Sequence, residues 1–168
     1  MINLYVDMDG VVADFDDFIK DYYPELPHQE RFRKAVTEEN VFEILGDMEG
    51  GTLLMDSINK LKSKFKEEEL QINFLTSVGT KDPDLATIVS EQKQKWLTSR
   101  GYPYKPLFVT EKKYKAKYAH SNAILIDDRP GSVQPFREAG GRAILHKYPQ
   151  DTIYALEEHL EVLSGQTV

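Results

Sequence analysis

Cysteine is absent from this chain of 168 residues, which excludes a disulfide scaffold, thiolate metal ligands and a cysteine nucleophile. The lack of cysteine also fits a reducing compartment. No apolar run approaches the roughly 20 residues that a membrane span requires. No basic segment with a cleavage site precedes the first apolar run, which starts at Ile2. We therefore expect a soluble cytoplasmic protein with no membrane partner.

Basic residues are outnumbered by acidic ones: the chain has 21 Lys and Arg residues and 28 Asp and Glu residues, which gives a net charge of −7 at pH 7. Such a protein repels polyanions at long range, so nucleic acid is disfavoured as a partner. Hydrophobic residues make up 40% of the chain, far from the composition of a disordered protein. The length predicts one domain with at most a small insertion, and it leaves a homodimer open.

Short apolar runs that end in polar residues recur along the chain, and they are typical of strands buried in a parallel sheet. They cover residues 2–6, 72–75, 107–109, 124–126 and 143–145. Helical patterns separate the later runs: Asp82 is a candidate N-cap with Pro83 in the first helical position, and Asp151 is a candidate N-cap of the last helix. This alternation predicts an α/β fold with a mainly parallel sheet flanked by helices.

The stretch from Asp14 to Leu70 is far longer than the dozen or more residues that a crossover between parallel strands needs. Its apolar spacing predicts helices over 16–23, 30–37 and 52–65, separated by prolines and by Gly50-Gly51. We interpret it as a small helical cap inserted after the first strand. The expected organisation is a core domain of residues 1–14 and 71–168, and a cap of residues 15–70.

Two acidic clusters follow predicted strands, Asp7-Met8-Asp9-Gly10 and Asp127-Asp128-Arg129-Pro130. Ligands of open α/β sheets bind outside the carboxyl ends of the strands. Carboxylates that converge there repel one another and favour a bound divalent cation, and oxygen ligands suit Mg²⁺ better than zinc. A single Asp after a strand is more often a helix cap, but two clusters in one chain favour a metal site.

A third predicted strand is followed by Thr76-Ser77, and a group of lysines at 112–117 precedes the second acidic cluster. Hydroxyl groups and backbone N–H groups at such a turn can bind an anion. Thr-Ser after a strand is usually a simple turn. Combined with a metal and a lysine ammonium, however, it predicts a phosphate site.

These motifs resemble those of phosphatases of the haloacid dehalogenase (HAD) superfamily. The segment from Asp7 to Phe15 is similar to their first motif, and Leu75-Thr76-Ser77 is similar to the second. A lysine within 112–117 corresponds to the third motif, and the segment from Leu125 to Pro130 corresponds to the fourth. The likeness is strongest to the 5′(3′)-deoxyribonucleotidases, including their phage and bacterial members. It spans residues 2 to about 145 and implies a HAD-like Rossmannoid sheet with a helical cap.

The resemblance implies an Mg²⁺-dependent hydrolysis of a small-molecule phosphomonoester, with a nucleotide as the expected substrate. Asp7 would be the nucleophile that forms an aspartyl-phosphate. Asp9 would protonate the leaving group and then activate water. Asp7, the backbone carbonyl of Asp9 and Asp128 would hold the metal, with Asp127 binding it directly or through water.

Thr76, Ser77 and one lysine would bind the phosphoryl oxygens. Lys115 precedes Ala116, Tyr118 and Ala119 in a helix start, the usual setting of the third motif, whereas Lys117 has a spacing to Asp127 that also occurs. We favour Lys115 and keep Lys117 as the alternative. In the cap, the candidates for contact with a nucleobase or sugar are Phe15, Phe42 and Leu45, although a single such residue is more often ordinary cap core.

Three other functions compete with this interpretation. A phospho-signalling receiver domain also uses aspartates, Thr or Ser and Lys, but there the acid pair comes first and the phosphorylated Asp lies on the third strand. A 3′-phosphatase acting on nucleic-acid ends is disfavoured by the net charge of −7 and by the lack of a basic stripe with aromatic residues. A phosphosugar or other small-metabolite phosphatase stays open.

Overall fold

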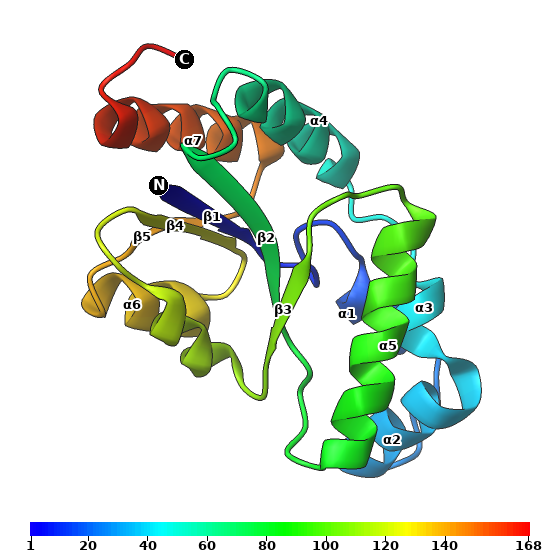
Figure 1. Cartoon of the computed structure of the whole chain (residues 1–168). Helices are drawn as coiled ribbons and strands as arrows, with labels where there is room; N and C mark the ends of the chain where they lie inside the picture. Colours follow the sequence, from blue (N-terminus) through cyan, green and yellow to red (C-terminus); the bar gives the residue numbers. More distant parts are fainter.

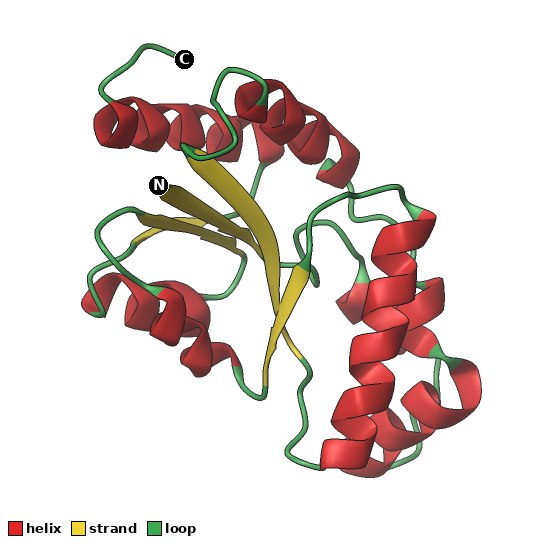
Figure 2. Cartoon of the chain, in the orientation of Figure 1, coloured by secondary structure: helices red, strands yellow, loops and turns green.

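A five-stranded sheet forms the centre of the protein in a computed structural model that describes all 168 residues (Figures 1 and 2). Every neighbouring pair of strands is parallel, and the order across the sheet is β3-β2-β1-β4-β5. The strands are β1 (Ile2–Val6), β2 (Leu70–Ser77), β3 (Pro106–Val109), β4 (Ala123–Asp127) and β5 (Arg142–Leu145). The predicted α/β class, with a parallel sheet flanked by helices, is confirmed.

The strands were found where apolar runs predicted them, but β2 is longer than its run. Leu70 pairs with Ile2 of β1, and Ser77 pairs with Val109 of β3. Pairing with two neighbours, rather than hydrophobicity, therefore sets the ends of β2. As a result, Thr76 and Ser77 belong to the end of the strand instead of the turn after it.

Side chains of successive strand residues alternate between the two faces of the sheet. Leu4 of β1, beside Ile72 and Ile124 in register, belongs to the larger apolar cluster, which includes residues of α4 (Gly51–Lys62), α5 (Pro83–Ser99) and α7 (Pro149–Ser164). Tyr5 and Leu125 belong to the smaller cluster, with Val133 and Phe136 of α6 (Pro130–Glu138). Both faces are thus covered, as a parallel sheet requires.

One of the two predicted N-caps is confirmed. The side chain of Asp82 accepts hydrogen bonds from the backbone N–H groups of Asp84 and Leu85, and Pro83 occupies the first position of α5. The last helix instead begins at Pro149, so Asp151 lies in its first turn and does not cap it. Pro149 explains the difference, because proline is well suited to the first helical position and starts α7 earlier than predicted.

The insertion after β1 divides between two places. Its first three helices, α1 (Phe15–Ile19), α2 (His28–Glu39) and α3 (Val41–Ile44), gather near α5, as Figure 1 shows. Helix α4, which we expected in the cap, lies alongside α7 and buries Leu54, Met55, Ile58 and Leu61 in the larger apolar cluster. The apolar face of α4 is therefore buried against the sheet side of the core rather than among the other helices of the insertion. No helix of the protein is both long enough and apolar enough to cross a membrane.

Candidate active site

A tight turn after β1 presents the first acidic cluster at the carboxyl edge of the sheet. The backbone N–H groups of residues 11–13 all donate to the carbonyl oxygen of Met8, at 2.9–3.1 Å. Gly10 has a φ of +83°, a left-handed conformation that side chains rarely adopt. The side chain of Met8 is buried in the core, whereas Asp7 and Asp9 both line one cavity. The turn therefore directs the two carboxylates to the same place.

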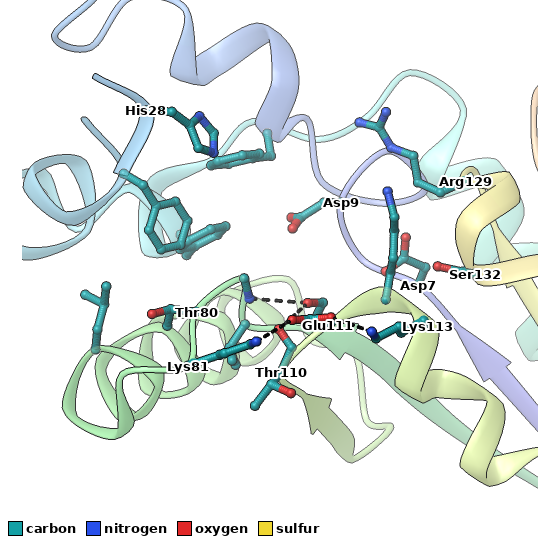
Figure 3. A pocket seen from close by; sticks show the side chains of 18 of the residues that line it. Asp7, Asp9, His28, Thr80, Lys81, Thr110, Glu111, Lys113, Arg129 and Ser132 are labelled. Atoms are coloured by element: carbon teal, nitrogen blue, oxygen red, sulfur yellow. Dashed lines mark hydrogen bonds and ion pairs between the residues drawn. The ribbon is translucent and has the colours of Figure 1, made fainter. Parts of the chain in front are cut away.

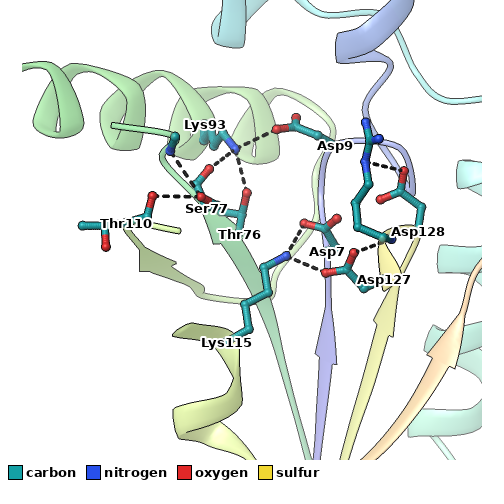
Figure 4. A network of polar contacts seen from close by, with 11 residues as sticks. Asp7, Asp9, Thr76, Ser77, Lys93, Thr110, Lys115, Asp127 and Asp128 are labelled. Atoms are coloured by element: carbon teal, nitrogen blue, oxygen red, sulfur yellow. Dashed lines mark hydrogen bonds and ion pairs between the residues drawn. The ribbon is translucent and has the colours of Figure 1, made fainter. Parts of the chain in front are cut away.

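Lys115 lies between the two acidic clusters (Figure 4). Its Nζ atom donates to Oδ1 of Asp7 at 2.8 Å and to Oδ2 of Asp127 at 2.6 Å, and its side chain is 2% exposed. Burial by itself would lower the pKa of Lys115, but the two carboxylates outweigh burial and raise the pKa above its ordinary value. The lysine is held as an ammonium ion at the carboxyl ends of β1 and β4.

Lys117, the alternative for the same role, is exposed and lies outside the cavity. Its Nζ atom is 5.3 Å from the centre of the Tyr118 ring. Both lysines belong to η1, the 3₁₀ helix Lys112–Tyr118. With about three residues per turn, positions 115 and 117 project in different directions. The structure thus brings Lys115 to the aspartates and leaves Lys117 in solvent.

Carboxylate oxygens of Asp7, Asp127 and Asp128 all lie within 4.8 Å of one another. Burial, followed by the charge of Asp127, raises the pKa of Asp7, and burial with the charge of Asp7 raises the pKa of Asp128 to about 7. Burial and the repulsion between the carboxylates therefore oppose their ionisation, and a bound cation would offset both effects. The side chain of Asp9 is not part of this group.

The three carboxylates fit a divalent cation. Both oxygens of Asp127 are already bonded, to Lys115 and to the backbone N–H of Arg129, whereas Oδ1 of Asp128 is buried without a partner. A Cβ atom on Gly10 would lie 2.1 Å from Oδ2 of Asp128, so the glycine makes room for this carboxylate. An oxygen-only set with a free buried ligand atom suits Mg²⁺.

Lys93 of α5 is a second buried lysine, and the sequence analysis did not identify it. Its Nζ atom donates to Oδ2 of Asp9 at 3.0 Å, to Oγ1 of Thr76 at 2.6 Å and to the carbonyl oxygen of Ser77 at 2.9 Å (Figure 4). The side chain is 1% exposed. A signal was present, because Lys93 lies on the apolar face of α5 between Val89 and Trp96. A lysine on such a face needs a buried partner.

Thr76 and Ser77 have different surroundings. Thr76 is fully buried and accepts a hydrogen bond from Lys93, whereas Ser77 lines the cavity and donates to the carbonyl oxygen of Thr110 at 3.1 Å. Both predicted hydroxyl residues are thus at the carboxyl end of β2, beside the acidic cluster at the end of β1.

The site opens into a cavity of about 1230 Å³ between the strand ends and the helices α1 and α2 (Figure 3). Phe15 and Phe42 line it with their rings stacked at 4.9 Å, and Phe32 packs edge-on against Phe42. His28, for which the sequence suggested no role in a site, also lines it. Leu45 does not: it is 2% exposed and lies in the apolar core. The expected substrate contact of Leu45 is therefore corrected to a packing role.

Charged residues surround the mouth of the cavity. Arg129 forms ion pairs with Asp16 of α1 and, at 3.6 Å, with Asp128. Arg33 of α2 pairs with Asp82 at 2.6 Å. The pairs Arg129–Asp16 and Arg33–Asp82 join the helices of the insertion to the loops that follow β4 and β2, so the mouth is bounded by both parts of the chain.

A hydrolase from Streptococcus pneumoniae TIGR4 has a similar solved structure, with a TM-score of 0.51 at 14% identity over 92% of this chain and 97% of that one. The chain has the fold of a known hydrolase. At this identity the likeness concerns the fold alone. None of the protein-family models compared with the sequence matches it, and neither does any curated protein.

Two further solved structures align less well. A D,D-heptose 1,7-bisphosphate phosphatase from Burkholderia thailandensis has a TM-score of 0.49 at 12% identity, covering 92% of this chain and 85% of its own. A haloacid dehalogenase-like hydrolase from Streptococcus pneumoniae has a TM-score of 0.47 at 14% identity, covering 98% of both chains.

Proposed function

We propose that this protein is an Mg²⁺-dependent phosphatase of the HAD type, which hydrolyses small phosphate monoesters through an aspartyl-phosphate on Asp7. The observation that carries the proposal is the meeting of two acidic clusters, two buried lysines and two hydroxyl residues at the carboxyl ends of β1, β2 and β4. Carboxylates can hold a metal ion and transfer protons, and ammonium and hydroxyl groups can bind phosphoryl oxygens, so this combination suits phosphoryl transfer.

Asp7 is the proposed nucleophile, and Lys115 orients it. One oxygen of Asp7 accepts from Lys115, which leaves the other to attack phosphorus. The ammonium group would supply positive charge to the oxygens of the transferring group, and Ser77, on the cavity wall beside the buried Thr76, would contact them. Asp7 and Asp128 would hold Mg²⁺, with Asp127 in support, and the bound metal would neutralise the charge of the phosphate dianion.

Asp9 is the proposed general acid and base. It gives a proton to the leaving oxygen as the bond from phosphorus to that oxygen breaks, and then takes a proton from the water that attacks the aspartyl-phosphate. The helices of the insertion limit the access of bulk water to that intermediate. The products are an alcohol and inorganic phosphate, and Asp7 is regenerated.

A nucleoside monophosphate is the proposed substrate. The support is the stacked pair of Phe15 and Phe42 on the cavity wall, since an aromatic surface favours a nucleobase or the apolar face of a deoxyribose. Because the family most similar in its motifs favours pyrimidines, dUMP and dTMP are the first candidates.

The sheet order, with β1 between β2 and β4, differs from the 2-1-3-4-5 order of receiver domains and so speaks against the phospho-signalling alternative.

A substrate panel with and without metal tests this proposal. We expect hydrolysis of dUMP and dTMP to exceed that of glucose 6-phosphate and of a 3′-phosphorylated oligonucleotide in kcat/KM. EDTA should abolish the activity and Mg²⁺ restore it. Asp7→Asn should abolish turnover but keep the thermal unfolding temperature, because the amide is nearly isosteric yet a poor nucleophile. Wild-type turnover by this variant would refute the mechanism, and a preference for sugar phosphates would refute the nucleotide assignment.

A further inference from the structure

The ammonium group of Lys93 has a complete set of partners inside the protein. A lysine has three N–H donors, and here Asp9, Thr76 and the Ser77 carbonyl accept one bond each. With the side chain 1% exposed, no water replaces a lost partner. Removing an ammonium from water is unfavourable unless such partners are fixed in place. Lys93 therefore fixes the positions of the groups around it.

The consequence for Asp9 is that its two oxygens are no longer equivalent. Oδ2 accepts from Lys93 at 3.0 Å, whereas Oδ1 is buried and has no partner. The negative charge of the ionised Asp9 therefore lies beside the positive charge of Lys93.

The consequence for Thr76 concerns its hydroxyl hydrogen. Oγ1 accepts from Lys93 at 2.6 Å, so the hydroxyl hydrogen must point away from that nitrogen. The hydroxyl hydrogen is therefore available only to an acceptor other than Lys93. A single side chain thus sets the hydrogen-bonding role of Thr76, at the end of β2, and of Asp9, in the turn after β1.

The same turn of α5 also binds the helices of the insertion. Gln92, next to Lys93, accepts from the backbone N–H of Phe42 at 3.2 Å and donates to the carbonyl oxygen of Val36 at 2.8 Å. The Nζ atom of Lys93 lies 4.8 Å from the centre of the Phe42 ring. These contacts with Phe42 and Val36 therefore hold this turn of α5, and Lys93 with it, against the side of the cavity that carries Phe15 and Phe42.

We propose that Lys93 is a positioning residue that holds Asp9 for proton transfer to poor leaving groups. The proposal rests on the phosphatase function proposed above. As an oxygen of Asp7 bonds to phosphorus, the bond from phosphorus to the ester oxygen breaks and its electron pair stays on that oxygen. A proton from Asp9 neutralises it, and Lys93 stabilises the carboxylate left behind. In the second half, Asp9 takes a proton from water, and Lys93 keeps its own protons throughout.

Comparing an alkyl ester with an aryl ester distinguishes a role of Lys93 in proton transfer from a purely structural role. An alkoxide leaves poorly and needs the proton, whereas 4-nitrophenolate is stable as an anion and leaves without it. The measurement is kcat/KM for the best nucleoside monophosphate of the panel and for 4-nitrophenyl phosphate. This constant reports the steps up to cleavage of the ester bond, so hydrolysis of the aspartyl-phosphate does not enter.

Lys93→Met removes the charge and keeps the length of the side chain. We expect kcat/KM for the alkyl ester to fall about 100-fold, and for 4-nitrophenyl phosphate less than about tenfold. Lys95→Met is the matched control, since it makes the same change on an exposed position of the same helix and should alter neither constant. If Lys93→Met does not fold, Lys93→Gln carries the same comparison, because its amide can fill the site without the charge.

An equal loss on both esters, or no loss on either, would overturn the role of Lys93, whereas a loss confined to the alkyl ester supports it. The failure of the proposed function has a different signature. In that case the wild-type protein itself hydrolyses neither ester in the presence of Mg²⁺.

Discussion

The backbone of Gly10 lies so close to the side chain of Asp128 that a Cβ atom on residue 10 would be 2.1 Å from Oδ2 of that aspartate. Gly10 follows β1 and Asp128 follows β4, so the contact joins the two acidic clusters. The glycine is needed twice, for its φ of +83° and for the space it leaves to a proposed metal ligand.

Gly10→Ala should therefore impair metal binding more than it impairs folding. The left-handed backbone costs an alanine about 1–2 kcal/mol, and displacement of Asp128 should weaken Mg²⁺ binding about 10–100-fold. Gly101→Ala is the control, because Gly101 has a φ of +72° with nothing within 4 Å. Calorimetric titration with Mg²⁺ and thermal unfolding measure the two effects. Equal Mg²⁺ affinities in the two variants would contradict the proposed role of Asp128.

The choice between Lys115 and Lys117 can be tested by stability. Lys115→Met leaves Asp7 and Asp127 buried without their shared cation, which should lower the free energy of unfolding by about 3–5 kcal/mol in metal-free buffer. Lys117→Met removes the same charge from an exposed position and should change it by less than about 0.5 kcal/mol. Urea unfolding measures both. Similar losses in the two variants would show that the contacts of Lys115 contribute nothing specific.

The two aspartates after β4 should differ in their effect on the metal. Asp128 has a buried oxygen without a partner, whereas both oxygens of Asp127 are already bonded. Asp128→Ala should therefore raise the Mg²⁺ concentration needed for half-maximal activity more than Asp127→Ala does. The opposite ranking, in a titration of activity with Mg²⁺, would make Asp127 the direct ligand.

Replacing Phe15 should change substrate preference, whereas replacing Leu45 should change stability. Phe15 is partly exposed to the cavity, and its loss should reduce kcat/KM for dTMP about tenfold, since stacking on a base contributes about 1–3 kcal/mol and 1.36 kcal/mol is one decade. Phe15→Ala should leave 4-nitrophenyl phosphate nearly unaffected. Leu45→Ala should lower stability by about 2–5 kcal/mol and keep the ratio of the two substrates. A parallel loss on both substrates in Phe15→Ala would reduce Phe15 to a packing residue.

Phe42→Ala has a less specific outcome. Phe42 is 3% exposed and packs against both Phe15 and Phe32. Its removal should reduce the ratio of kcat/KM for dTMP to that for 4-nitrophenyl phosphate. It should also lower the unfolding temperature, because removing a buried aromatic side chain leaves a cavity. Substrate ratios measured well below that temperature distinguish the two effects. An unchanged ratio would show that Phe42 is core alone.

His159, far from the site, should make a contribution to stability that is lost as pH falls from neutral to mildly acidic, whereas the raised pKa values of Asp7 and Asp128 act in the opposite direction. Burial, followed by the charge of Arg142, lowers the pKa of His159, and Arg142 donates to its Nδ1 atom at 3.2 Å. The unfolded chain thus takes up a proton near pH 6.5 while the folded chain resists it, so the contribution of His159 to stability decreases as pH falls through this range. From pH 7.5 to pH 5.5, the free energy of unfolding of His159→Gln should increase relative to that of the wild-type protein. An identical pH dependence in both proteins would exclude a contribution of His159.

The sequence by itself determined the sheet and the position of most of the site. Apolar runs marked all five strands because a parallel sheet buried on both faces needs them, and the carboxyl ends of parallel strands meet at one edge. The convergence of Asp7, Asp127 and Thr76 on that edge followed from the order of motifs. Asp82 and Pro83 marked the start of α5, since a cap and its first turn are local in sequence.

The tertiary structure decided everything that depends on contacts between distant residues. It brought Lys115, rather than Lys117, into contact with Asp7 and Asp127, placed α4 beside α7 rather than with the other helices of the insertion, and buried Leu45 in the core. It also revealed Lys93, whose partner Asp9 lies 84 positions away in the chain. A lysine on an apolar helix face shows that a partner is needed, but only the packing of α5 against the ends of β1 and β2 determines which carboxylate that partner is.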